Sequence, residues 1–381
     1  MNTSAEPLHL LLIFGGRSCE HAVSVTSAKS LIAAISDAPY RIQFIGITEQ
    51  GRWRWAEEAS IDSIVSEGVV DPQAGLGVLP DLNFPGRFMN AKSGRHFSFK
   101  ADMIFPLLHG PYGEDGTLQG LLEMFDVPYV GCAVVASACG MDKLISKRLF
   151  EKAGIPQADY VEVRRQNWLE DASRVMAEIE RSLNLPVFVK PANMGSSVGI
   201  TKVTGFEQLE AAITHALEFD LKVLVENGFE KMLEVECGLL GNEQPEASVV
   251  GEIRSGAEFY DYASKYVETT STVVIPAPIS EAASNRVREL AIKAFKALDG
   301  SGLARADFFV DPRSDQVWLN EINTLPGFTP ISMYPKLWAA SGLPYAGLVA
   351  KLIELAKARF EMKKSLKCSY SVPEKESDKK I

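Results

Sequence analysis

The fold follows from one stretch, Leu319-Asn320-Glu321-Ile322-Asn323-Thr324-Leu325-Pro326-Gly327, read with Arg305-Ala306-Asp307-Phe308-Phe309 just upstream. Both segments mix apolar residues with single polar ones, as β-strands do. Glu321 and Asn323 are two residues apart and therefore share one face of a strand. A neighbouring strand would add Asp307 and complete a set of hard oxygen ligands, which suits Mg²⁺. The alternative is a hairpin with solvated acids on one face.

Two neighbouring features favour the metal site over the hairpin. Arg305 lies two residues before Asp307, so its charge faces the same site. Pro326-Gly327 turns the chain and leaves a bare backbone amide beside the expected metal.

The composition limits the class of protein. A length of 381 residues predicts two or three domains, and 46% apolar with 23% charged residues allows each domain a core. A net charge of −10 argues against a nucleic-acid surface. The five cysteines are scattered, which is typical of free thiols in a reducing compartment. Because we find neither a membrane-length apolar run nor a signal-peptide pattern, we expect a cytoplasmic protein.

The first part of the chain has the order of a Rossmann-like βαβ unit. Leu8 to Phe14 is an apolar run typical of a strand buried on both faces, and helical spacing follows from Val23 to Ile35. The turn between them, Gly15 to His21, is where ligands gather in such folds. Glu20 and His21 are therefore acid and base candidates, although a polar helix start is an equally good interpretation.

A second ligand loop is predicted after the apolar strand Ala101 to Leu108. His109-Gly-Pro-Tyr-Gly-Glu-Asp-Gly116 carries three glycines, two acids and a histidine before a helix that begins at Thr117. The glycines let backbone amides approach a ligand, and the helix start favours an anion. We expect a substrate with a carboxylate here, with a structural turn as the alternative. Residues 51–100 contain many glycines and prolines and show little periodicity, which predicts irregular strands and loops; we assign no function there.

Phosphate-binding residues are predicted beyond a domain boundary near residue 140. A helix from Met141 to Ala153 carries Lys143. Lys190 ends an apolar strand where the small-residue loop Pro191 to Ile200 begins. This order differs from the common phosphate loop, in which the lysine follows the glycines. The loop could still cover a triphosphate, and a plain glycine hairpin is the alternative.

The remainder predicts a nucleotide hinge, a lid and the closing helices. A strand from Lys222 to Glu226 ends in an acid and Glu234 begins another strand, which suits contacts to adenine and ribose; solvent-facing acids are the alternative. Residues 254–274 lack a clear period and contain three tyrosines, as expected of a lid. Helices are predicted over residues 168–181, 281–298, 333–341 and 345–360.

Taken together, these motifs resemble the ATP-grasp D-alanine–D-alanine ligases, in particular the longer A-type enzymes. The resemblance runs from about residue 8 to 360 and is strongest in the segments 109–120, 302–309 and 320–327. Gly15 to His21, Lys190 to Gly199 and Lys265-Tyr266 add to it. The departures are Ala22, where an acid is common, and Phe229 to Leu233, which lacks a glycine that is common in that turn.

The resemblance implies an α/β architecture: an ATP-grasp fold with an N-terminal Rossmann-like (pre-ATP-grasp) domain. The expected parts are an N-terminal substrate domain over residues 1–140, a central ATP-grasp subdomain over 141–224 and a C-terminal one over 225–360. The last would carry the lid 254–274, and a polar, disordered tail would fill residues 361–381.

The implied reaction joins two D-alanines to D-alanyl-D-alanine at the expense of ATP, through an acylphosphate, for peptidoglycan synthesis. ATP would be the co-substrate and two Mg²⁺ (or Mn²⁺) ions would assist, with a homodimer as the expected assembly and neither nucleic acid nor membrane as a partner. A D-alanine–D-lactate ligase would share nearly every motif. A non-catalytic ATP-binding protein of this fold is the other alternative, but such proteins tend to lose the metal ligands or the arginine.

The resemblance also assigns roles to individual residues. Metal ligands would be Asp307, Glu321 and Asn323. ATP contacts would be Lys143, Lys190, Glu226, Glu234 and Lys265, with the ribose contact open between Glu234 and Glu236. Catalytic residues would be Glu20, Ser196, Tyr266, Arg305 and Gly327, of which Arg305 and Gly327 form the oxyanion hole. The alanine sites would be lined by Glu20, His109, Ser332 and Met333.

Overall fold

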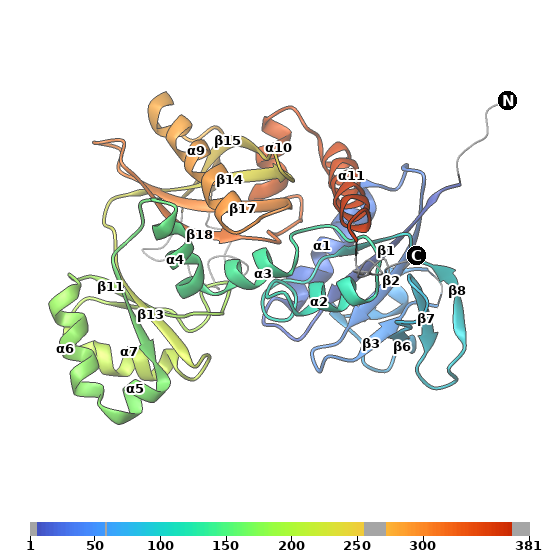
Figure 1. The fold of residues 1–381 in the computed structure, drawn as a ribbon, viewed down its shortest axis with the longest axis horizontal. Helices are drawn as coiled ribbons and strands as arrows, with labels where there is room; N and C mark the ends of the chain where they lie inside the picture. The colour runs from blue at the N-terminus through green and yellow to red at the C-terminus, as the bar shows by residue number, and fades with distance from the viewer. Residues whose placement is uncertain (1–5, 58, 255–271, 368–381) are drawn as a thin grey trace, which may run out of the picture.

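The computed structural model describes residues 6–57, 59–254 and 272–367. Its elements fall in three parts along the chain, which Figure 1 colours from blue through green and yellow to red. Within the described ranges, no helix has the length and apolar character that a membrane crossing requires.

The first part is organised around β1 (Leu8–Gly15), which is buried from Leu10 onward. It pairs in parallel with β2 (Tyr40–Ile47) and β9 (Met103–Pro106), in the strand order β8-β7-β6-β3-β2-β1-β9. The two-sided burial of β1 predicted from its apolar run is confirmed. The other elements here are α1 (His21–Ala34), β3 (Trp53–Trp55), η1 (Ile61–Ser63), β4 (Val65–Ser66), β5 (Val69–Val70), β6 (Leu76–Pro80), β7 (Arg87–Asn90), β8 (His96–Lys100), α2 (Thr117–Met124) and α3 (Val134–Met141).

The second part is an antiparallel sheet with helices packed on it, at the lower left of Figure 1. Its strand order is β10-β13-β11-β12. The bounds are α4 (Lys143–Lys152), β10 (Tyr160–Arg164), α5 (Arg165–Glu170), α6 (Ala172–Ser182), β11 (Val187–Pro191), β12 (Thr201–Val203), η2 (Phe206–Gln208), α7 (Leu209–Ala216) and β13 (Lys222–Asn227). The single helix predicted over residues 168–181 is wrong. Asp171 divides it, because its side chain accepts a hydrogen bond from Arg174 N and starts α6 anew.

The third part is an antiparallel sheet with the order β16-β15-β14-β17-β18, and apolar residues of α9 pack against it. The bounds are β14 (Leu233–Gly241), β15 (Glu246–Arg254), β16 (Thr272–Val274), α9 (Glu281–Ala297), β17 (Gly302–Val310), β18 (Val317–Asn323), α10 (Met333–Ala340) and α11 (Tyr345–Lys364).

All three predicted domain limits fall inside elements of the structure. The limit at 140/141 separates Met141 from the rest of α3. The limit at 224/225 would cut β13, which stays in the second sheet through Asn227 because it pairs there with β11. The limit at 360/361 lies within α11, which continues to Lys364. We therefore propose 227/228 as the second limit; residues 368–381 of the expected tail lie outside the described residues.

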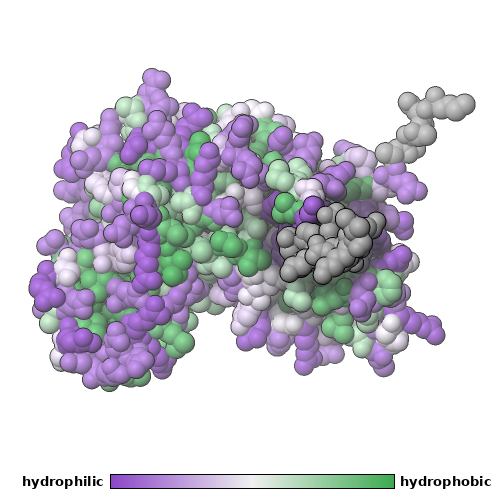
Figure 2. Space-filling view, viewed as in Figure 1, coloured by the Kyte–Doolittle hydropathy of each residue, from purple (hydrophilic) through white to green (hydrophobic). Residues whose placement is uncertain are grey.

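The last helix shares a core with the first strand. Leu348 and Leu352 of α11 belong to the same buried cluster as Leu10 and Phe14 of β1. Arg359 adds polar contacts between the ends of the fold, since its Nη2 donates to the Tyr129 carbonyl at 2.9 Å. Apolar residues on the face in Figure 2 gather near the junction of the second part with the others, amid a mostly hydrophilic surface.

Candidate active site

The predicted metal ligands meet on the strands β17 and β18. The antiparallel register sets Asp307 opposite Glu321 and Arg305 opposite Asn323. Asn323 Nδ2 donates a hydrogen bond to Asp307 Oδ2 at 3.0 Å, so the two side chains are in direct contact. The predicted adjacency of these residues on paired strands is confirmed, and their role as metal ligands stays a prediction.

The donor set fits a hard divalent cation. Among the described residues, no three His, Cys, Asp or Glu side chains gather as metal ligands. The third oxygen donor here is the amide of Asn323, which pairs with Asp307. Two carboxylates and an amide oxygen are typical of Mg²⁺ sites, in which water and nucleotide phosphates complete the coordination. Asp307, Glu321 and Asn323 would hold the ion.

Arg305 is bound on both sides by acids. Its Nε and Nη2 donate to the two carboxylate oxygens of Asp307, each at 2.7 Å, and Nε lies 2.8 Å from Glu236 Oε2. Burial alone would lower the pKa of Arg305, but the charges of Asp307 and Glu236 hold it well above the usual value. A permanent positive charge is thus fixed beside the metal ligands. Sequence reasoning did not find the pairing with Glu236, which requires knowing that β14 lies beside β17.

The predicted phosphate lysines reach the same region from α4 and β11. Lys143 Nζ donates to the Met194 carbonyl at 2.8 Å and lies 3.4 Å from Glu321 Oε2. Lys190 Nζ lies 2.5 Å from Glu226 Oε1. Both ammonium groups are largely buried, so they are held where an anionic ligand would meet them.

Glu226 is shared by two lysines. Besides Lys190, Lys147 Nζ lies 2.8 Å from its Oε2, and the side chains of Lys147 and Glu226 are 3% and 6% exposed. Burial would raise the pKa of Glu226, but the two ammonium groups outweigh burial and bring it to about 2. Lys147 was not predicted as a site residue. Its spacing of four from Lys143 puts both lysines on one face of a helix, which could have indicated a shared site.

The first βα turn contacts the glycine-rich loop, as Ser196 Oγ donates a hydrogen bond to Glu20 Oε1. The two residues come from the first and second parts of the chain. His21, the base candidate, has a structural role instead. It is buried, its Nδ1 donates to the Gly16 carbonyl at 2.8 Å, and its Nε2 accepts from Val70 N at 3.0 Å.

His109 bridges the first and third parts. Its Nδ1 donates to the Leu325 carbonyl at 3.2 Å, and its Nε2 lies 3.1 Å from Ser27 Oγ. Burial lowers the pKa of His109 and favours the neutral ring, whose Nε2 then accepts from the hydroxyl.

Glu114 lies in the motif His109 to Gly116 but was not predicted as a site residue. Its carboxylate accepts from Gly110 N at 2.6 Å and from Leu325 N at 3.3 Å. Burial, followed by the nearby charge of Glu20, raises the pKa of Glu114 to about 8. An acid before a helix usually faces solvent, so only the three-dimensional structure shows that Glu114 is partly buried.

Gly327 and Ser332 lie in contact at the end of the site. A Cβ atom on residue 327 would meet Ser332 Oγ at 2.9 Å, so the absence of a side chain there permits the close approach. Ser332 Oγ accepts from Thr329 N at 3.1 Å.

One cavity of about 890 Å³ joins these groups. Its lining includes the described residues predicted for the site, namely Glu20, His109, Lys143, Lys190, Ser196, Glu226, Glu234, Arg305, Asp307, Glu321, Asn323, Gly327, Ser332 and Met333. Glu236 also lines it, but its ion pair with Arg305 favours Glu234 as the ribose contact. Lys265, Tyr266 and most of the predicted lid lie outside the described residues.

Two antiparallel sheets that hold buried lysines and hard oxygen ligands around one cavity define an ATP-grasp protein, and the parallel β1–β2–β9 unit adds the Rossmann-like first domain. Family models described as "D-ala D-ala ligase N-terminus" and "D-ala D-ala ligase C-terminus" match residues 9–132 and 149–354. The chain belongs to the D-alanine–D-alanine ligase family.

Individual relatives agree along nearly the whole chain. A D-alanine–D-alanine ligase of Heliobacterium modesticaldum is 48% identical over 354 residues, covering 93% of this chain and 96% of the relative. One from Bacillus velezensis is 43% identical, covering 94% and 100%.

Solved structures show the same fold. The D-alanine–D-alanine ligase from Coxiella burnetii has a TM-score of 0.78 at 35% identity, covering 94% of this chain and 97% of that one. The VanG D-Ala:D-Ser ligase from Enterococcus faecalis has a TM-score of 0.79 at 36% identity, covering 92% and 99%. The predicted family and fold class are confirmed.

Proposed function

We propose that this protein joins two D-alanine molecules to D-alanyl-D-alanine, with conversion of ATP to ADP and phosphate, for peptidoglycan synthesis. One observation carries the proposal. A single cavity contains lysines suited to a triphosphate, oxygen ligands suited to Mg²⁺, and the Glu20–Ser196 and Gly327–Ser332 pairs suited to amino-acid substrates.

The chemistry begins with a carboxylate, which is a poor electrophile. Transfer of the γ-phosphoryl group of ATP gives an acylphosphate, and the amine of the second D-alanine then displaces phosphate. Both steps develop negative charge, so positioning and electrostatic stabilisation supply most of the catalysis. Two Mg²⁺ or Mn²⁺ ions on Asp307, Glu321 and Asn323 would neutralise charge on the triphosphate when bound.

We assign the oxyanion hole to Arg305 and the backbone amide of Gly327. Arg305 is suited to this role because its charge does not depend on pH and its neighbours fix its direction. Because residue 327 has no side chain, its backbone amide stays accessible beside Ser332. These donors would meet charge that appears in the tetrahedral intermediate.

The amino-acid sites are assigned around the oxyanion. Glu20 would bind the ammonium of the first D-alanine, in a set with Ser196 and Tyr266. Ser332 would bind the second carboxylate, with His109 and Met333 lining the pocket. Tyr266 and Lys265, the latter a phosphate contact, are assigned from the sequence motif alone.

The nucleotide is assigned to the cleft between the second and third parts. Lys143 and Lys190 would contact phosphates, Glu226 adenine and Glu234 ribose. We also propose a cytoplasmic homodimer without a nucleic-acid or membrane partner, in keeping with the net charge of −10 and the scattered cysteines.

The test is incubation with ATP, Mg²⁺ and D-alanine, with phosphate and dipeptide both measured. We expect equal amounts of the two products, and no dipeptide with L-alanine. D-lactate and D-serine in parallel distinguish the related ligases, one of which the VanG structure represents. Failure to release phosphate in response to D-alanine, from protein that binds ADP, would overturn the proposal in favour of a non-catalytic nucleotide-binding protein.

A further inference from the structure

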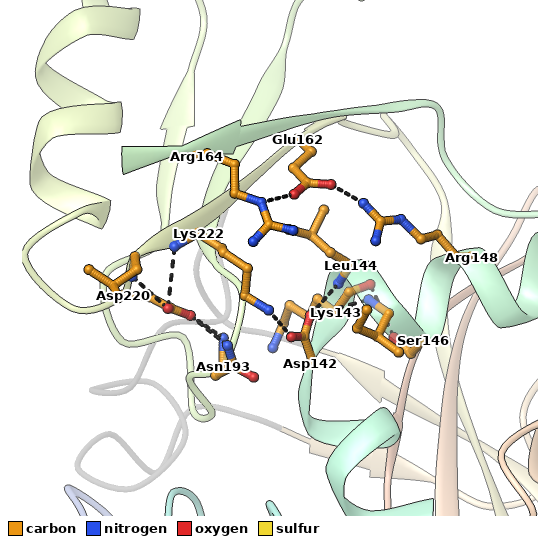
Figure 3. Close-up of polar contacts among 12 residues, drawn as sticks. Asp142, Lys143, Leu144, Ser146, Arg148, Glu162, Arg164, Asn193, Asp220 and Lys222 are labelled. Carbon is orange, nitrogen blue, oxygen red and sulfur yellow. Dashed lines mark hydrogen bonds and ion pairs between the residues drawn. The ribbon is translucent and has the colours of Figure 1, made fainter. Parts of the chain in front are cut away.

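A polar network lies at the base of the glycine-rich loop that follows β11 (Figure 3). Its members are Asp142, Asn193, Asp220 and Lys222. None of these four side chains lines the cavity, so none has a role in the site described above.

Asp220 fixes the loop at Asn193, near its start. Its Oδ2 accepts from the backbone N and from Nδ2 of Asn193, at 2.8 and 2.9 Å. Its Oδ1 accepts from Leu221 N at 2.6 Å. One carboxylate therefore ties the start of the loop to the start of β13.

Lys222 connects this point to α4. Its carbonyl accepts from Ala192 N at 3.0 Å, and its ammonium group donates to Asp142 Oδ2. Asp142 Oδ1 in turn accepts from Leu144 N at 3.1 Å, which caps the helix. Asp142 thus serves an ion pair and a helix start at once.

Lys143, next to Asp142, carries the network into the cavity. Its backbone N donates to the Ala192 carbonyl at 3.0 Å, and its Nζ donates to the Met194 carbonyl at 2.8 Å. The same Nζ lies 3.4 Å from Glu321 Oε2. The network therefore begins on β13 and ends at a phosphate lysine and a metal ligand.

The loop needs such support because part of it is strained. Ser196 and Ser197 have φ angles of 49° and 60°, in the left-handed region that non-glycine residues rarely adopt. Such a conformation persists only where the surroundings hold it. Asp220 and Lys143 hold the loop at Asn193 and Met194, just before these serines.

We propose that Asp142, Asp220 and Lys222 are positioning residues for the phosphates of ATP. They touch no substrate, and they act by fixing Lys143 and loop Asn193–Gly199 in the geometry that receives the triphosphate. The inference deepens the proposed function and rests on it.

Two variants separate the positioning role from helix stability. Asp142→Asn keeps a good N-cap but loses the charge that pairs with Lys222, and Lys222→Met removes the other partner. We expect each to raise the KM for ATP and the Kd for ADP by about tenfold, as loss of a charged hydrogen bond does. The double variant should be no worse than either single one, because both remove one interaction. Lys222→Arg should restore part of the affinity.

Asp220→Ala tests the other end of the network with a phosphate-specific readout. Calorimetry should show weaker binding of ADP but unchanged binding of adenosine, which has no phosphate. The KM for D-alanine should change less than the KM for ATP. A purely structural role would weaken the binding of both ADP and adenosine and would lower the Tm in parallel.

The matched control is Glu162→Gln on the neighbouring strand β10. Glu162 pairs with Arg148 and Arg164 in Figure 3 and contacts neither the loop nor the cavity. The ADP affinity of the Glu162→Gln variant should equal that of the native protein. Unchanged ADP affinity in Asp142→Asn and Asp220→Ala, or equal loss of ADP and adenosine binding, would overturn the inference. If the native protein itself bound no ADP, the proposed function would fail instead.

Discussion

Glu321 Oε2 lies 3.4 Å from Lys143 Nζ, although the two residues come from β18 and the first turn of α4. A carboxylate suited to a cation and an ammonium group suited to a phosphate thus neutralise each other. A cation bound at Glu321 would release Lys143 for a phosphate oxygen. The arrangement favours joint arrival of the cation and the nucleotide, since the cation would meet the carboxylate while a phosphate oxygen meets the ammonium group.

Glu321→Gln should abolish turnover while the protein stays folded. A charged ligand is lost from a site made of oxygens, whereas the amide fills the same volume. Phosphate release measures the effect, and the Mg²⁺ dependence of ADP binding gives a readout independent of turnover. Native-like phosphate release at saturating Mg²⁺ would contradict the assignment.

Arg305→Met should lower kcat by on the order of 100-fold or more, with a smaller effect on the KM for ATP. The charge that Arg305 meets develops mainly in the transition state. The variant also leaves Asp307 and Glu236 without their cation, so we expect a loss of about 1–3 kcal/mol in unfolding free energy. Arg305→Lys controls for that loss because it keeps a charge without the two-pronged geometry. Lost ATP binding with kcat preserved would instead identify a ground-state nucleotide contact.

Lys147→Met should destabilise the protein at neutral pH and weaken the dependence of its stability on pH in acid. Glu226 has a pKa of about 2, below its unfolded value, so its stabilising contribution is complete above the unfolded pKa of about 4.5 and is lost as the pH falls toward 2. Removal of one ammonium group brings the pKa of Glu226 closer to normal, so this contribution becomes smaller. The Tm of the variant should lie below that of the native protein at neutral pH, and the difference should narrow as the pH falls below about 4.5. Thermal unfolding between pH 3 and 7 measures this convergence. Arg148→Gln, one residue further along the helix and half exposed, is the matched control.

Glu114→Gln should flatten the pH dependence of stability in a different window. The raised pKa of Glu114, about 8, means that the folded protein keeps a proton which the unfolded chain loses near pH 4.5. Its contribution to stability therefore falls as the pH rises from about 5 to 8 and is constant above that range. The Tm of the native protein should fall relative to that of the variant across this interval. Parallel Tm curves would show that Glu114 ionises normally.

Tyr266→Phe should keep ATP turnover but gain ester formation with D-lactate, more so at low pH. D-alanine must lose a proton before its amine attacks, whereas D-lactate carries no such charge, so discrimination depends on groups near the nucleophile. Competition between D-alanine and D-lactate across a range of pH measures the product ratio. A ratio equal to that of the native protein would leave Tyr266 with a packing role only.

Local sequence patterns predicted the elements that carry the site, because strand alternation and glycine-rich turns are local signals. The pairing of Asp307 with Glu321 followed from two adjacent strands with strong patterns. Glu236 and Lys147 were not assigned as partners of Arg305 and Glu226, because those contacts join elements distant in sequence. The role of His21 could not be decided from the sequence, because its partner Val70 lies in a region with little periodicity.

Helix limits depended on side-chain contacts that pattern alone does not contain. The extension of α11 beyond Phe360 coincides with an ion pair between Lys363 and Glu123 of the first part. The limit at 224/225 lies inside the predicted strand Lys222 to Glu226 as well as inside β13. Its pairing continues to Asn227, opposite Val187.

The buried core that α11 and β1 share also has a consequence for how the protein is made. The first sheet leaves the ribosome early, but Leu348 and Leu352 complete one face of its core. Domains generally begin to fold during synthesis from the N-terminal side. The buried cluster that contains Leu10 and Phe14 of β1 is therefore completed only after residues 345–364 have been translated. We expect part of this apolar surface to stay uncovered on the growing chain, where a chaperone that shields such surface would bind it.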